Sequence, residues 1–154
     1  MDDFLFAIIL VMKVFISYKY ANESIERLEE ILLNARNALG EMKIKSHCSY
    51  FAVPNGIDPN DGSNMMKSSF SELKKSDLLL AIQDSESRSE GMLMEVGYAI
   101  ACNKPLIIFT KNDVKNTYLP GIADLSIYYS DVIDLHKKIK QIDFSALVNN
   151  KKYL

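Results

Sequence analysis

The alternation of short apolar runs with segments of helical periodicity constrains this chain more than any other feature. The runs are rich in apolar, β-branched and aromatic residues, and their length is typical of strands. They occupy residues 12–18, 43–51, 77–82, 105–110 and 124–130. Apolar residues recur at helical spacing in residues 22–40, 65–76, 90–104 and 131–142. This order predicts a parallel sheet that is covered by helices on both faces.

Right-handed crossovers between such strands predict a single-domain, doubly wound parallel α/β sheet of about five strands, of the flavodoxin-like or Rossmann-like class. The 154 residues are enough for one such domain, which we place at residues 12–145, and too few for two. Residues 146–154 are interpreted as a tail. Ligands of doubly wound sheets bind at the carboxyl ends of the strands. We therefore expect the site in the segments that follow the strands: residues 18–21, 52–64, 83–89 and 111–117.

An apolar run, Phe4–Met12, precedes the first predicted strand. It follows two Asp residues and no small-residue cleavage site comes after it, so it does not match a secretory signal. It is also too short to span a bilayer as a helix, which needs about 20 residues. Residues 1–11 are therefore either an extension onto the first strand or a non-native start with Met12 as the true one. The sequence "MKVFISY" reads as a natural beginning and favours the second interpretation.

The charge and the Cys and His content exclude several classes of function. A net charge of −2 argues against long nucleic acid as a partner. The two cysteines, Cys48 and Cys102, have no metal-ligand spacing and are too few for a disulfide framework. His47 and His136 lie far apart in the sequence, so we expect no metal site. A reduced cytoplasmic compartment, away from membranes, fits these features.

One carboxylate, Glu95, interrupts the apolar helical segment 90–104. On a helical wheel it lies at the edge of the apolar face, about one and a half turns from the start of the helix. A carboxylate there can face a pocket, and the helix N-terminus would help to keep it ionised. Alternatively, Glu95 is a half-exposed surface residue. Ser87 and Glu90 also match a capping box, which explains the preceding loop without a ligand.

Residues 76–109 resemble the central block of the nucleoside 2-deoxyribosyltransferase family and of its hydrolase branch, the 2′-deoxynucleoside 5′-phosphate N-hydrolases. These proteins carry a strand and a loop, and then Ser-x-Gly-x-x-x-Glu with Gly-Tyr-Ala or a near variant after it. The matching residues here are Ser89, Gly91, Glu95, Gly97, Tyr98 and Ala99. The first strand and the order of elements extend the resemblance over most of the chain.

The resemblance implies that Glu95 is a nucleophile on the anomeric carbon of a nucleoside or nucleotide, in a hydrolysis or a deoxyribosyl transfer. It implies that Ser89 binds a 5′-phosphate, although Ser89 can equally be a simple helix cap. Asp84 would bind a sugar hydroxyl or assist the base, or it is a plain loop acid. No metal or organic cofactor is implied. The residues that we expect to bind substrate are Ser17, Tyr18, Lys19, Ser69, Ser87, Ser89, Gly91 and Tyr98.

Family members are homo-oligomers whose sites are completed by a neighbouring subunit, so the resemblance also implies a homodimer or a higher homo-oligomer. The loop at residues 111–121 is the expected donor, with Asn116 or Thr117 as the contributing residue. Tyr118 and Leu119 would then anchor the interface, or they pack under the loop of their own chain.

The sequence departs from the family pattern at three places. Ser69 stands where the family has a proton-handling Asp, unless Asp84 or Glu86 substitutes for it. Phe15 stands where the family has a Tyr that contacts the nucleophile, and the Gly-rich turn after the first strand is missing. These departures leave a non-catalytic nucleotide-binding or interaction module as one alternative.

A weaker resemblance provides a second alternative. The stretch "VFISYKYANES" at residues 14–24 looks like the opening of TIR domains. Some TIR domains cleave the nicotinamide glycosidic bond of NAD with a Glu on a helix, and many act as assembly modules. In that interpretation Glu95 keeps its role and the substrate becomes NAD.

Overall fold

Five parallel strands form one sheet in the order β2-β1-β3-β4-β5, and the computed structural model describes residues 11–151 of the chain. The strands are β1 (Lys13–Tyr18), β2 (Lys45–His47), β3 (Leu78–Gln83), β4 (Leu106–Lys111) and β5 (Leu125–Tyr129). This order is that of flavodoxin-like doubly wound sheets, so the predicted fold class is confirmed. The expectations for residues 1–10 lie outside the described residues.

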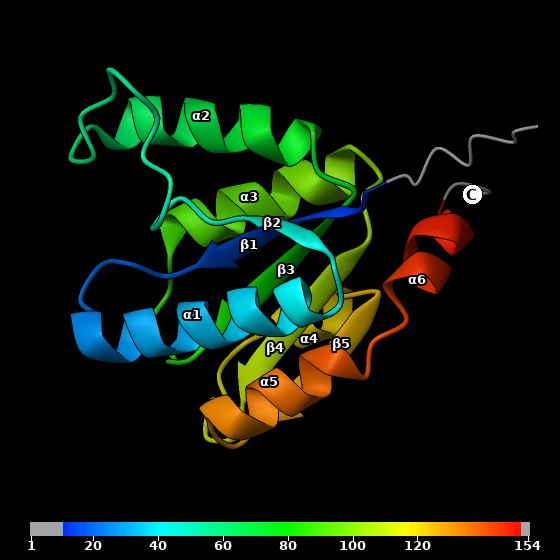
Figure 1. Cartoon of the computed structure of the whole chain (residues 1–154). Coiled ribbons are helices and arrows are strands. Elements are labelled where there is room, and N and C mark those ends of the chain that lie inside the picture. The colour runs from blue at the N-terminus through cyan, green and yellow to red at the C-terminus, as the bar shows by residue number, and fades with distance from the viewer. Residues whose placement is uncertain (1–10, 152–154) are drawn as a thin grey trace, which may run out of the picture.

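The helices cover both faces of the sheet. They are α1 (Ile25–Glu41), α2 (Gly62–Lys74), α3 (Glu90–Ala101), α4 (Leu119–Ile122), α5 (Val132–Lys140) and α6 (Phe144–Lys151). Figure 1 shows α2 and α3 together on one side of the sheet, and α1 and α5 together on the other. Two hydrophobic clusters match this division, because α1, α5 and α6 contribute to one and α2, α3 and α4 to the other.

The alternation of side chains along β1 decides which residues meet α3. Val14 and Ile16 belong to the cluster with α1 and α5, whereas Phe15 belongs to the cluster with α2 and α3. Successive side chains of a strand point to opposite faces, so Ser17 lies on the same face as Phe15. Ser17 is fully buried and is the register partner of Ala81 in β3. A hydroxyl is thus placed under α3, close to the carboxyl end of the sheet.

Several element boundaries differ from those expected. The second strand is Lys45–His47 rather than residues 43–51, because the chain turns after it, with Phe51 N–H donating to the Cys48 carbonyl at 3.1 Å. α2 begins at Gly62 rather than at residue 65, because the Asp61 side chain accepts from Asn64 N–H at 3.1 Å. Residues 146–151 of the expected tail belong to α6, which buries Val148, and residues 152–154 lie outside the described residues.

In the described range 11–151, no helix is long and apolar enough to cross a membrane. The same residues hold no group of three or more His, Cys, Asp or Glu side chains that could bind a metal ion.

Candidate functional site

Glu95 is buried at the junction of three elements. Only 8% of the residue is exposed, on the side of α3 that faces β1 and α2. The Ser17 hydroxyl, from β1, donates a hydrogen bond to Glu95 Oε2. The Ser69 hydroxyl, from α2, also interacts with the carboxylate. The structure therefore brings together three of the residues selected from the sequence, and the alternative of a half-exposed surface Glu is wrong.

Burial dominates the protonation of this carboxylate. It raises the pKa of Glu95 to about 7, while the hydrogen bond from Ser17 and the nearby Ser69 hydroxyl act in the opposite direction. The expected help from the helix N-terminus in keeping Glu95 ionised stays a prediction, and the loss of hydration dominates the pKa. Among the salt bridges of residues 11–151, none joins Glu95 to a cation.

Two further titratable side chains lie close enough to feel the charge of Glu95. Burial raises the pKa of the Tyr18 hydroxyl far above its usual range, and the pKa of the Cys48 thiol to about 12, and the charge of Glu95 adds to both shifts. Both groups are therefore protonated at neutral pH. Tyr18 was expected at the site, and its ring lies edge-on to Tyr50 at 6.4 Å. Cys48 was not expected, because nothing in its sequence neighbourhood points to Glu95.

Asp84 is held by two partners from distant parts of the chain. Arg27 Nη2 donates to Asp84 Oδ1 at 3.1 Å, and Arg27 Nε donates to Oδ2 at 3.2 Å. The hydroxyl of Tyr129, a fully buried residue, donates to Oδ1 at 2.6 Å. This network joins the loop after β3 to α1 and to the end of β5. It favours a role for Asp84 in positioning the loop, and its expected role in catalysis stays a prediction.

The network predicts a loss of stability when Arg27 is removed. Arg27→Ala is expected to lower the free energy of unfolding by about 2 kcal/mol, because a partly buried carboxylate loses its charged donor. Urea denaturation monitored by circular dichroism measures the change. Arg27→Lys is the matched control: it keeps the charge but not the planar fork, so it should restore part of the stability. An unchanged unfolding midpoint in Arg27→Ala would contradict the role given to the network.

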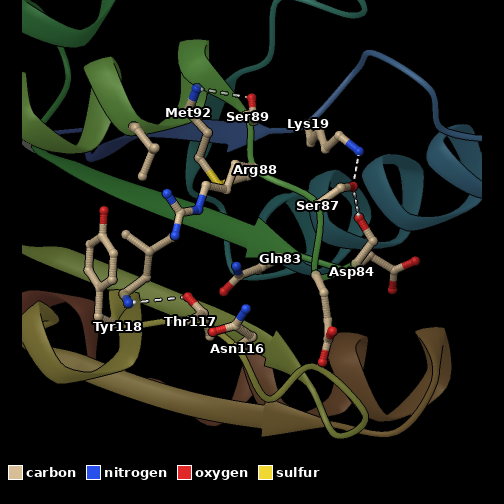
Figure 2. A pocket seen from close by; sticks show the side chains of 14 residues that line it. Lys19, Gln83, Asp84, Ser87, Arg88, Ser89, Met92, Asn116, Thr117 and Tyr118 are labelled. Carbon is tan, nitrogen blue, oxygen red and sulfur yellow. Dashed lines mark hydrogen bonds between the residues drawn. The ribbon is translucent and has the colours of Figure 1, made fainter.

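A pocket opens beside α3 at the carboxyl edge of the sheet (Figure 2). Its walls come from the loop after β3, the first turn of α3, the segment before α4, and the residue that follows β1. Of the residues selected from the sequence, the pocket is lined by Lys19, Asp84, Ser87, Ser89, Asn116 and Thr117. Glu95, Ser17 and Ser69 do not line it. The candidate site thus has two parts: a buried carboxylate cluster (Ser17, Ser69 and Glu95) and this polar pocket.

The loop at the pocket is organised by hydrogen bonds. Lys19 Nζ donates to Glu23 Oε1 at 2.9 Å and to the Ser87 hydroxyl. The Ser89 hydroxyl accepts from Met92 N–H at 3.2 Å, so Ser89 is the N-cap of α3. The expected capping box at Ser87 and Glu90 is therefore wrong, because the helix starts two residues later than that box requires.

Arg88 is the cation of the pocket that remains free for a ligand. In Figure 2 its guanidinium points into the pocket, on the opposite side from Asn116 and Thr117. Among residues 11–151 no salt bridge to Arg88 is formed. The Thr117 hydroxyl accepts from Leu119 N–H at 3.2 Å, which fixes the opposite wall. Asp84 and Glu86 also line the pocket, so Arg88 is the side chain there that can bind an anionic ligand.

Two of the selected residues have contacts that need no ligand. The ring of Tyr98 stacks on Phe70 with the ring centroids 5.0 Å apart, which joins α3 to α2. A Cβ atom at Gly91 would lie 3.5 Å from the Met66 sulfur, which is ordinary contact.

Sequence reasoning also missed Gln83, whose amide points into the pocket (Figure 2). A polar residue at the end of the apolar run 77–82 was the available signal.

A family model described as nucleoside 2-deoxyribosyltransferase matches residues 20–147 of the chain. No match is found among curated protein sequences.

Solved structures show the same fold. The chain is similar to a 2-deoxyribosyltransferase from Bacillus psychrosaccharolyticus, with a TM-score of 0.67 and 17% identity over 88% of this chain and 95% of the other. It is also similar to a CMP N-glycosidase from Clostridium botulinum, with a TM-score of 0.61 and 17% identity over 84% and 98% of the two chains. A conserved protein from Enterococcus faecalis has a TM-score of 0.61 and 16% identity over 85% and 98%.

Proposed function

Because the chain belongs to the nucleoside 2-deoxyribosyltransferase family, we propose that it cleaves the N-glycosidic bond of a nucleoside 5′-monophosphate, with Glu95 as the nucleophile. The observation that carries the proposal is the buried carboxylate of Glu95, held by Ser17 and by Ser69 near the carboxyl end of β1. Burying a carboxylate without a cation is unfavourable, so a purely structural helix gains nothing from an acid at this position.

The chemistry follows from the charge that develops on the sugar. Cleavage of an N-glycosidic bond gives the sugar oxocarbenium character, which a nearby carboxylate stabilises and can trap as a covalent glycosyl ester. Water then attacks the anomeric carbon and releases the carboxylate. The hydroxyl of Ser17 orients Glu95 Oε2 for this attack. Hydrolysis is favoured over transfer because Arg88, in the polar pocket, can bind a phosphate.

The phosphate is assigned to the polar pocket. Arg88 points into it, Lys19 lines it, and the N-terminus of α3 at Ser89 has the polarity that favours anions. We place the sugar between this pocket and the carboxylate cluster, so that the 5′-phosphate and the anomeric carbon lie at opposite ends of one bound molecule.

We also propose that the active form is a homodimer. Three large apolar side chains in and next to α3 and α4 are exposed to solvent. Their exposed fractions are 62% for Tyr118, 47% for Ile100 and 46% for Ile122. Exposed apolar patches of this kind suit an interface between subunits. Asn116 and Thr117 line the pocket of their own chain. Their contribution to a neighbouring subunit therefore stays a prediction, which sedimentation of the purified protein would begin to test.

The proposal predicts a preference for monophosphates that depends on Arg88. The measurement is chromatographic detection of free base from a panel of deoxynucleosides, their 5′-monophosphates and NAD. We expect faster release from monophosphates than from the matching nucleosides. Arg88→Ala should raise the KM for monophosphates by about tenfold or more, since it removes a charge-assisted contact, while rates with nucleosides stay unchanged. Lys115→Ala, which removes an exposed cation outside the pocket lining, is the control.

Different outcomes would identify different functions. Equal rates with nucleosides and monophosphates would contradict the proposed phosphate site but not the proposed glycosidase activity. Release of nicotinamide from NAD, without release of base from any monophosphate, nicotinamide mononucleotide included, would favour the TIR-like alternative. Tight binding of nucleotides without release of any base would favour a binding module.

A further inference from the structure

We propose that the preferred substrates are N-glycosides whose base carries a formal positive charge, such as pyridinium nucleotides or N7-alkylated purine nucleotides. This inference rests on the proposed function, because it takes Glu95 as the nucleophile. It comes from two observations on the carboxylate cluster within residues 11–151: the groups beside Glu95 are hydroxyls rather than acids, and no salt bridge joins Glu95 to a cation.

The first observation concerns the leaving group. A neutral base leaves with an extra electron pair on its ring nitrogen, so its departure is normally assisted by a general acid. The groups that touch Glu95 are the hydroxyls of Ser17 and Ser69. A serine hydroxyl has far too high a pKa to act as a proton donor of this kind.

The other titratable groups of the site do not supply the acid either. Glu86 is exposed at the polar pocket, where it accepts from Lys115 N–H at 3.0 Å, and it does not contact Glu95. Tyr18 and Cys48 are near Glu95, but burial makes both of them weaker acids than usual.

Asp84 accepts from Arg27 through both of its oxygens and from Tyr129 through Oδ1. Both oxygens of Asp84 are thus occupied by donors from Arg27 and Tyr129, which hold the side chain in the network described above.

The second observation concerns charge. Glu95 is 8% exposed, yet within residues 11–151 its polar partners are neutral hydroxyls and no salt bridge reaches it. A buried carboxylate of this kind gains most from a ligand that brings a positive charge. A base with a formal positive charge supplies it in the ground state, next to the anomeric carbon that Glu95 attacks.

The two parts of the site have opposite preferences. Arg88, unpaired within residues 11–151, favours an anion in the pocket, whereas Glu95 favours a cation in the carboxylate cluster. A nucleotide with a cationic base and a 5′-phosphate carries both charges on one molecule. The electrostatic pattern of the site therefore fits such a zwitterionic nucleotide better than a neutral nucleoside.

The reaction balances without an acid. A carboxylate oxygen of Glu95 forms a bond to the anomeric carbon while the bond to the ring nitrogen breaks. Its electron pair moves to that nitrogen, which loses its positive charge, and the base leaves neutral. Water then attacks the anomeric carbon, the ester bond returns its electron pair to Glu95, and the proton from water passes to solvent.

The test compares matched substrates that differ in the charge of the base. Deoxyguanosine 5′-monophosphate and its N7-methyl derivative form the matched pair. Cytidine 5′-monophosphate and nicotinamide mononucleotide form a second pair, which shares the ribose 5′-phosphate but differs in the base. The spontaneous release of base without enzyme is subtracted from each rate, because alkylated purines also lose their base on their own. We expect kcat/KM, corrected in this way, to be about a hundredfold higher for the cationic members, which is the typical contribution of the missing acid.

A substitution at Ser69 tests the reason for the preference. Ser69→Asp places a carboxyl group beside Glu95, where two neighbouring carboxyls share a proton and one becomes an acid near neutral pH. We expect it to raise the rate with the neutral substrates by about tenfold or more, without raising the rate with the cationic ones. Ser69→Asn has nearly the same shape but no acid, and should give no such gain.

The outcomes separate this inference from the proposed function. Equal corrected rates within each pair, or release of base from the neutral members alone, would contradict the preference for cationic bases. Neither result would contradict the proposed glycosidase activity. No release from any substrate by folded protein would overturn both. If Ser69→Asp does not fold, the wild-type comparison decides alone.

Discussion

Glu95→Gln is expected to lower the rate of base release by about a thousandfold or more, the effect that removal of a nucleophile usually has. Gln has almost the same shape as Glu, and its amide oxygen can still accept the hydrogen bond from Ser17. The fold should therefore survive while the nucleophile is lost. The amide also cannot supply the negative charge that stabilises the developing oxocarbenium ion.

The measurement is release of free base from the best substrate of the panel, with circular dichroism as the check on folding. Glu90→Gln is the matched control, because Glu90 lies in the first turn of the same helix but is exposed. It should keep nearly all of the activity. Full activity in Glu95→Gln would show that Glu95 is not the nucleophile, and would leave the polar pocket without its proposed chemistry.

The fold was predictable because its signals are local. Apolar runs shorter than a buried helix alternate with amphipathic segments, and this order specifies a parallel sheet before any contact is known. The position of Glu95 on a helix beside the carboxyl ends of the strands follows from the same pattern. Most boundaries were correct to within a few residues, and the larger errors arose where a turn or a cap depends on one side chain, as at Asp61.

The site was only partly predictable because its contacts span large separations in sequence. A helical wheel places Glu95 at the edge of an apolar face, but its burial depends on α2, whose Ser69 meets it across the tertiary structure. The bond from Tyr129 to Asp84 joins residues 45 positions apart, and that from Arg27 to Asp84 joins residues 57 apart. No local pattern in one sequence reports such pairs.

The same Glu95→Gln substitution is expected to stabilise the fold at high pH. Glu95 has a pKa of about 7 in the folded protein, against 4.5 as its ordinary value, mainly because burial disfavours the charged form. Below pH 4.5 the group is protonated in both states and burial of its charge has no cost. As the pH rises toward 7, the unfolded chain releases its proton first, which favours unfolding.

The size of the effect follows from the shift. A difference of about 2.5 pKa units, at 1.36 kcal/mol each, corresponds to about 3 kcal/mol, which is fully present above pH 7. Gln carries no charge at any pH, so the variant should be more stable than the wild type by up to about 3 kcal/mol at pH 8 and equally stable near pH 4. Urea denaturation of both proteins at the two pH values measures this difference.

Glu72→Gln provides a control of opposite sign. Lys13 donates to Glu72 at 2.8 Å, and this bond lowers the pKa of Glu72 below its ordinary value. Ionised Glu72 therefore stabilises the fold above pH 4.5. This contribution is lost as the pH falls through the pKa that Glu72 has in the folded protein. Glu72→Gln should destabilise the protein at pH 8 and less so at low pH.

If Glu95→Gln also lost stability at pH 8, then Ser17 and Ser69 would stabilise the carboxylate more than burial disfavours it. The cluster would then not be the unneutralised acid on which a preference for cationic substrates depends.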